Sequence, residues 1–106
     1  GNYIPTMVFD EVDSGVGGAV AEMVGLRLKE LGENRQVLCV THLPQVASQA
    51  KSHIKINKMT DGKSTKVHLT NLMRNSRVEE IARMLGGIKV TKRTREHAAE
   101  MLEIKG

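Results

Sequence analysis

The first third of the chain alternates between two hydrophobic patterns. Two short apolar runs, residues 4–9 and 36–41, predict buried strands. Between them, apolar side chains recur every three or four positions and predict a helix over 18–31, with one apolar face made of Val20, Val24, Leu28 and Leu31. Gly32 is a natural stop signal for this helix. A strand, a helix and a strand in this order predict a parallel βαβ unit, and the near-continuous apolar runs are typical of a sheet covered on both faces.

The hydrophobic period changes in the middle of the chain. Pro44 predicts the start of a short helix that continues to about residue 50. After it, apolar and polar residues alternate around Ile54 and Ile56, and again around Val67 and Leu69. An Asp-Gly turn separates the two alternating runs, so an antiparallel hairpin is predicted over 52–59 and 64–72.

The last third of the chain predicts two helices. Ser76 and Glu79 have the spacing of a capping box, and the apolar positions that follow them end at Gly86–Gly87. Thr91 is placed to cap a final helix with an inner face of Ala98, Met101 and Leu102. The expected fold class is therefore α/β, with a parallel βαβ unit followed by an antiparallel hairpin and two C-terminal helices.

Composition narrows the function classes. A chain of 106 residues with 40% hydrophobic and 26% charged residues fits one small globular domain. No apolar run approaches the roughly 18 residues that a membrane span needs, and we expect no signal peptide and no membrane partner. The net charge of +4 permits an anionic partner, whereas an aromatic content of 2% argues against stacking on single-stranded bases. Because the chain starts with Gly1, we expect an excised fragment of a longer protein.

Cys39 is the single cysteine and lies inside the second apolar run. It cannot form an internal disulfide. We interpret it as a small buried hydrophobic residue in a protein from a reducing compartment.

Polar side chains follow both predicted parallel strands at their C-terminal ends. Asp10 and Glu11 end the first strand, and Thr41 and His42 follow the second. Because open α/β sheets bind ligands at this edge, we expect Asp10 to hold Mg²⁺ through a coordinated water and Glu11 to act as general base. His42 would contact a terminal phosphate. Three alternatives stay open: a solvated strand end, Thr41 as a turn cap, and a two-metal hydrolase that uses Asp10, Glu11, Asp13 and His42.

A glycine-rich loop separates the first strand from its helix. Its candidate nucleotide-binding residues are Ser14, Gly15, Gly17 and Gly18. A loop of this kind before a helix can cradle phosphate, but the order Gly-x-x-x-x-Gly-Lys-Ser/Thr of a P-loop is missing. The sequence therefore favours a close-approach loop over a phosphate cradle, and a flexible strand-to-helix turn stays open as the alternative.

The remaining histidines and the basic residues near the C-terminus suggest weaker possibilities. His53, His68 and His97 show no metal-ligand spacing, so we expect them on the surface. Four basic residues near the last helix could contact DNA, although such runs are usually solvated faces; they are Lys89, Lys92, Arg93 and Arg95.

Several of these strings resemble motifs of a known ATPase class. Phe9-Asp10-Glu11-Val12-Asp13 resembles the Walker B motif of ABC-type ATPases, in the form seen in the SMC-like branch. Residues 14–18 stand where that class has its D-loop, and Thr41-His42 stands where it has the switch histidine. Together with Leu43-Pro44-Gln45-Val46-Ala47 and the later Ile81–Gly87 string, the sequence closely resembles the RecN family of bacterial DNA repair proteins.

The resemblance implies that residues 1–106 form the C-terminal lobe of an ABC/SMC-like ATPase head, a partial P-loop NTPase. By position, Asp10 would associate with Mg²⁺, Glu11 would be the catalytic base and His42 would contact the γ-phosphate of ATP. The D-loop would face a second head in a homodimer. The implied role is recombinational repair of DNA double-strand breaks by a cytoplasmic, nucleoid-associated protein.

The sequence departs from that class in what it lacks. It has no P-loop lysine, no Leu-Ser-Gly-Gly signature motif and no coiled-coil heptads. Because the P-loop holds the phosphates, we predict that this fragment alone neither binds ATP tightly nor hydrolyses it. A partial sheet also has an exposed edge through which the fragment can self-associate. The competing hypothesis is a non-catalytic DNA-binding or assembly domain that uses the Lys89–Arg95 cluster.

Overall fold

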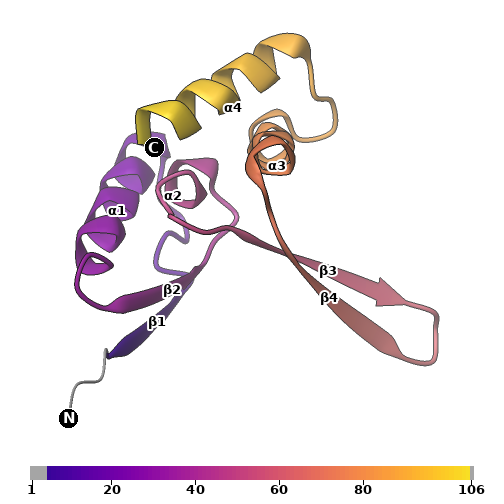
Figure 1. The fold of residues 1–106 in the computed structure, drawn as a ribbon. Coiled ribbons are helices and arrows are strands. Elements are labelled where there is room, and N and C mark those ends of the chain that lie inside the picture. The colour runs from indigo at the N-terminus through magenta and orange to yellow at the C-terminus, as the bar shows by residue number, and fades with distance from the viewer. Residues whose placement is uncertain (1–4, 106) are drawn as a thin grey trace.

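The computed structural model describes residues 5–105 and the side chains of residues 5–103. The start of the first predicted strand, Ile4, lies outside the described residues. In chain order the elements are β1 (Thr6–Asp10), α1 (Gly18–Leu31), β2 (Gln36–Val40), α2 (Pro44–Ala47), β3 (Ile54–Thr60), β4 (Thr65–Asn71), α3 (Arg74–Gly86) and α4 (Lys92–Lys105), as Figure 1 shows. This order and the two kinds of sheet confirm the predicted fold class.

The two N-terminal strands are parallel neighbours, joined by α1. Thr6 pairs with Gln36 and Asp10 pairs with Val40, so both strands begin and end in step. The Gln36 N–H donates to the Pro5 carbonyl over 3.0 Å at the first rung. The C-terminal ends of both strands therefore lie side by side at one edge of the sheet.

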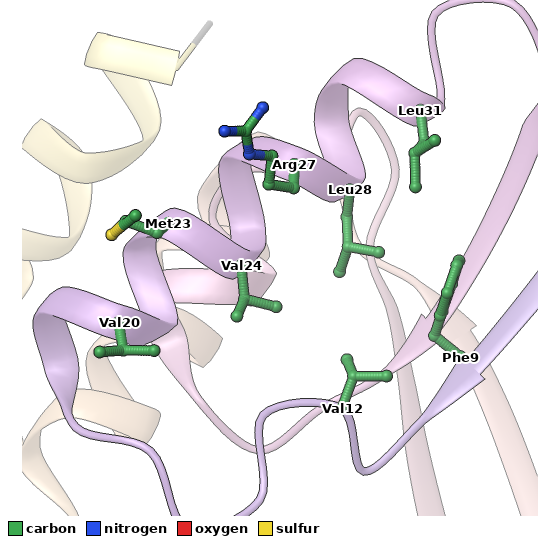
Figure 2. Close-up of a pocket in the computed structure, with 8 residues that line it drawn as sticks. All are labelled: Phe9, Val12, Val20, Met23, Val24, Arg27, Leu28 and Leu31. Atoms are coloured by element: carbon green, nitrogen blue, oxygen red, sulfur yellow. The ribbon is translucent and has the colours of Figure 1, made fainter.

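The β1–β2 sheet is incompletely covered by the described chain. Its outer face is open, with Val8 67%, Leu38 48% and Val40 53% exposed. On the other face, Val24, Leu28 and Leu31 point from α1 toward Phe9 and Val12 and line an apolar groove with them (Figure 2). The described residues thus do not provide the two-sided cover that the apolar runs led us to expect, because α1 reaches only one face.

The packed core lies among the helices that follow β2. Ala47 of α2, Ile81 and Ala82 of α3 and Ala98 of α4 are buried together. Six partly buried apolar side chains pack around them: Val78, Met84, Leu85, Val90, Met101 and Leu102. Together the ten residues include the whole inner face that the sequence predicts for the last helix, Ala98, Met101 and Leu102. We call α2, α3 and α4 the helical cluster.

The α1 helix meets α2 at a glycine. A Cβ added at Gly25 would lie 2.8 Å from the Gln49 side chain and 2.9 Å from the Gln45 carbonyl oxygen. Only a residue without a side chain permits this backbone approach. Gly25 therefore sets how the βαβ unit joins the helical cluster.

The predicted hairpin is present as β3 and β4, which pair antiparallel from Ile54↔Asn71 to Thr60↔Thr65. It projects away from the helices, and both strands are almost entirely exposed (Figure 1). At the turn, Asp61 Oδ1 accepts hydrogen bonds from the N–H groups of Lys63 and Ser64 over 3.0 and 2.8 Å. These bonds lower the pKa of the Asp61 carboxyl below its ordinary value.

Two predicted helix boundaries need correction, and one is confirmed. The α3 helix begins at Arg74, and Ser76 lies inside its first turn, where its hydroxyl accepts from Met73 N–H over 3.0 Å. Ser76 is therefore not the N-cap that the capping-box spacing indicated. The short α2 ends at Ala47 instead of residue 50. At α4, Thr91 Oγ1 accepts from the Thr94 N–H over 3.2 Å, which confirms the predicted cap.

Candidate functional site

Three predicted site residues follow the paired strand ends. Asp10 is the last residue of β1, Glu11 comes directly after it, and His42 lies two positions beyond the end of β2. Since Asp10 pairs with Val40, the two chain segments leave the sheet at the same edge. All three side chains are exposed and open to a ligand.

Glu11 has an unusual backbone conformation. Its φ is 59°, in the left-handed region that residues other than glycine seldom occupy. The Ser14 N–H donates to the Glu11 carbonyl over 3.2 Å and closes a turn directly after the strand. Strain of this kind persists where surrounding structure holds it, and it concentrates at functional sites.

The buried polar residue of this edge is Asp13, which is 1% exposed. Its Oδ2 accepts a hydrogen bond from the hydroxyl of Thr41, which follows the neighbouring strand. The same hydroxyl oxygen accepts the Leu43 N–H over 3.0 Å, so Thr41 does cap the turn after β2. Sequence reasoning considered Asp13 only as a possible metal ligand and missed its contact with Thr41. The sequence did offer a clue, because an acid, Asp13, and a hydroxyl residue, Thr41, follow the C-terminal ends of the two predicted parallel strands.

The acidic residues of the edge do not form a multi-ligand metal site. Within residues 5–103, no group of three or more His, Cys, Asp or Glu side chains is arranged to hold a metal ion. The two-metal alternative therefore has no support in this geometry. The exposed carboxylate of Asp10 is a donor that fits a single Mg²⁺ held largely through water.

The glycine loop has a conformational explanation at one position. Gly15 has φ +75°, which favours glycine, while Gly17 is the N-cap of α1. A Cβ at either position would meet no atom of the described chain within 4 Å. Gly18 starts α1, and its nearest atom would be Gln45 Nε2 at 3.5 Å. The described part of the chain therefore leaves the loop open to another surface.

Cys39 and His53 differ from their predicted environments. Cys39 is half-buried instead of fully buried, because the sheet is open. Burial, together with the carboxylates of Asp13 and Asp10, raises the pKa of its thiol and so favours the protonated, less nucleophilic form. His53 is half-buried and is not a surface residue as predicted, whereas His68 and His97 are exposed. Burial, helped by the positive charge of Arg77, lowers the pKa of His53.

Charged residues of α3 connect the helical cluster to its surroundings. Glu80 is 5% exposed, and its carboxylate pairs with Lys55 of β3 over 2.9 Å and with Arg83. The Arg77 guanidinium donates to the Ala47 and Ala50 carbonyls over 3.2 and 2.5 Å. The α3 helix thereby holds both the hairpin base and the segment that follows His42.

The predicted basic cluster is only partly available. Lys89, Lys92 and Arg93 are exposed near the start of α4. Arg95, by contrast, pairs with Glu79 of α3 over 2.7 Å. Its charge is therefore partly balanced within the protein.

The fold resembles that of a known class. A solved structure from work on ATP-driven dimerization and DNA-stimulated activation of SMC ATPases superposes with a TM-score of 0.63 at 24% identity. The match covers 83% of this chain and 50% of that one. The α/β arrangement is therefore that of part of an SMC-like ATPase head.

Sequence relatives narrow the class to one family. The chain is 49% identical over 100 residues to the DNA repair protein RecN of Xylella fastidiosa (strain Temecula1), 47% over 98 residues to that of Deinococcus radiodurans and 41% over 101 residues to that of Halalkalibacterium halodurans. These matches cover 94%, 92% and 95% of this chain. The chain belongs to the RecN family. It spans 18%, 17% and 18% of the length of these relatives.

No family model matches the sequence. In the part of the chain that the structure describes, every helix is too short or too polar to cross a membrane.

Proposed function

We propose that this chain forms the C-terminal lobe of the ATPase head of a RecN-type protein and supplies the Walker B acids and the switch histidine. The parent protein would act in recombinational repair of DNA double-strand breaks. The observation that carries the proposal is the in-step parallel pairing of β1 with β2. It makes the segments with Asp10, Glu11 and His42 leave the sheet at one edge, where all three side chains are exposed.

Each site residue has a separate role in the proposed hydrolysis of ATP. Asp10 would hold Mg²⁺ through a coordinated water, and the ion when bound balances the charge of the phosphates. Glu11 accepts a proton from the attacking water as its oxygen bonds to the γ-phosphorus and the bond to the leaving oxygen of ADP breaks. His42 donates a hydrogen bond to a γ-phosphate oxygen, where negative charge must be stabilised.

The proposed site is completed by other surfaces. Nothing in the sequence replaces a P-loop, so the remainder of the same head would hold the phosphates, and the fragment alone would be inactive. Ser14, Gly15, Gly17 and Gly18 would face a second head in a homodimer. Their open surroundings support this assignment, because a Cβ at Gly15 or Gly17 would meet no atom of residues 5–105 within 4 Å. DNA would be the partner of the full-length protein.

The decisive experiment replaces Glu11 in a full-length RecN-type protein that carries this sequence. We expect Glu11→Gln to lower the kcat of DNA-dependent ATP turnover by about 100-fold or more, the usual range for loss of a general base. The matched control is Glu33→Gln, which changes another exposed carboxylate between α1 and β2. Turnover that is unchanged in Glu11→Gln would show that the base is assigned wrongly.

His42 is tested in the same protein. We expect His42→Ala to lower kcat by roughly 10-fold or more, because a preorganised donor to the transferred phosphate is lost. His68→Ala in the exposed hairpin is the control and should leave kcat unchanged. If the two variants have equal activity, His42 does not contact the reacting phosphate.

The competing hypothesis makes a different prediction for the Lys89–Arg95 cluster. A gel shift on DNA at increasing salt would detect a non-catalytic binding domain in this chain. Affinity that disappears when Lys92, Arg93 and Arg95 are neutralised would favour that hypothesis. We expect little affinity, since Arg95 already pairs with Glu79.

A further inference from the structure

We propose that Asp13 and Thr41 are positioning residues that fix the Glu11 and His42 segments relative to each other. The inference rests on the proposed function and adds two residues to its site. The Thr41 hydroxyl, after β2, donates to the buried carboxylate of Asp13, after β1. The two residues are 28 positions apart in the sequence, and their contact joins the chain segments that leave the paired strands beside Asp10 and Val40.

The contact holds both segments at once. Asp13 lies two residues after Glu11, and Thr41 directly precedes His42. Thr41 Oγ1 also accepts the Leu43 N–H over 3.0 Å, so the main chain on the far side of His42 is fixed by the same oxygen. The hydroxyl has a single O–H, and donating it to Asp13 while accepting from Leu43 fixes its orientation.

Burial makes the arrangement specific. Asp13 is 1% exposed, although the acids before it, Asp10 and Glu11, are exposed. A buried carboxylate that loses its donor is costly, so the turn after β1 is stable only while Thr41 stays in place. An acid in this position is better explained by the need to join two segments than by packing.

The contact between Thr41 and Asp13 affects the reaction through the backbone of Glu11. Glu11 has φ 59°, a conformation that its own sequence does not favour. The turn that follows it is closed by Ser14 N–H to Glu11 O and by Val16 N–H to Asp13 O, over 3.2 and 3.4 Å. Anchoring Asp13 therefore holds this turn, and with it the direction in which the Glu11 carboxylate leaves the strand.

The test compares variants of the full-length protein. Thr41→Val keeps the shape of the side chain and removes the hydroxyl, whereas Thr41→Ser keeps the hydroxyl. Because small misplacements of catalytic groups are costly, we expect Thr41→Val to lower kcat by about 10-fold or more. The KM of Thr41→Val for ATP should stay within about 3-fold of the wild-type value. The kcat of Thr41→Ser should likewise stay within about 3-fold of wild type. Thr70→Val in the exposed β4 is the matched control.

A double variant tests whether the two residues act as a unit. Asp13→Ala combined with Thr41→Val should lower kcat no further than the more damaging single change, because both remove the same contact. Fully additive losses would overturn the proposal. So would equal losses in Thr41→Val and Thr41→Ser, which would point to packing instead of the hydroxyl.

Asp13→Asn tests whether Asp13 acts by accepting the Thr41 hydrogen bond or through its negative charge. It also replaces Thr41→Val as the test if that variant does not fold. The amide oxygen still accepts the Thr41 hydroxyl, so kcat should stay within about 10-fold of wild type. A loss as large as that in Glu11→Gln would overturn the positioning role.

The same variants separate failure of this inference from failure of the proposed function. If Glu11→Gln abolishes turnover while Thr41→Val has wild-type kcat, this inference fails and the proposed function stands. If Glu11→Gln is itself fully active, both fail.

Discussion

The helical cluster and the βαβ unit bury their apolar residues to very different extents. In the cluster, Ile81, Ala82 and Ala98 have no exposed surface. In the βαβ unit, apolar side chains on both faces of the sheet remain accessible, and the α1 groove is open (Figure 2). The candidate site belongs to the open unit, which packs on the helical cluster where α1 meets α2. Parallel sheets are normally covered on both sides, so the unit that carries the candidate site is the one whose sheet lacks cover in the described chain.

The strongest test of this comparison is a truncation in each region. We expect Ile81→Ala to lower the free energy of unfolding by about 3 kcal/mol, because it leaves a cavity in a packed core. Leu38→Ala removes a similar side chain that is 48% exposed and should cost less than about 1 kcal/mol. Urea unfolding of both variants gives the two values. Equal losses would mean that the two regions are equally well packed.

The second test concerns the joint between the regions. Gly25→Ala places a methyl group 2.9 Å from the Gln45 carbonyl oxygen and should cost about 2 kcal/mol by overpacking. Gly32→Ala is the matched control, since its nearest atoms lie at 3.5 Å and its φ is −75°. Thermal unfolding should show a lowered midpoint for Gly25→Ala alone. A tolerated Gly25→Ala would show that α1 can shift freely on α2.

A third test concerns the charge buried in the cluster. Burial acts to raise the pKa of Glu80, but the hydrogen bonds and charges of Arg83 and Lys55 outweigh it, so the pKa lies below its ordinary value. The resulting stabilisation is present above the unfolded pKa of about 4.3 and is lost as pH falls through the folded pKa. We expect Glu80→Gln to lower stability at pH 7 by about 1.5 kcal/mol.

The pH dependence checks the cause of that loss. Urea unfolding of wild type and Glu80→Gln should give values that converge as the solution is acidified below about pH 4. The conservative control is Glu79→Gln, which removes an exposed partner of Arg95 and should cost much less. A difference between wild type and Glu80→Gln that is constant with pH would point to packing instead of charge.

The smallest expected effect comes from His53. Its folded pKa is lowered by burial first and by Arg77 second, so protonation favours the unfolded chain. The contribution of neutral His53 is complete above the unfolded pKa of about 6.5 and is lost as pH falls through the folded pKa. Between pH 7 and pH 5, wild type should lose at most a few degrees more of Tm than His53→Gln. The exposed His68→Gln should behave as wild type.

Local sequence rules predicted most of the elements. The β1–α1–β2 order, the hairpin and α4 depend on hydrophobic period, an Asp-Gly turn and a threonine cap, which are encoded within a few residues. The start of α3 was misplaced because Ser76 satisfies the capping spacing while its hydroxyl serves the first turn from inside. Local spacing does not distinguish these two uses of one hydroxyl.

The candidate site was only partly predictable for a different reason. Asp10, Glu11 and His42 follow directly from the ends of two strands. The burial of Asp13 depends on Thr41, 28 residues away, and becomes visible only when the strands pair in register. The environments of His53 and Cys39 likewise depend on which neighbours cover them. Sequence periodicity indicates that a face is apolar, but it does not identify the segment that packs on it.

The hairpin offers a practical use that follows from its isolation. Its ends meet where Leu72 N–H donates to His53 O over 2.9 Å, and its distal turn at Asp61–Ser64 packs against nothing else in the described chain (Figure 1). Exposed turn tips of this kind accept insertions readily. A fluorescent label or affinity peptide inserted beside Gly62 would therefore mark the protein without disturbing the helices or the C-terminal ends of β1 and β2.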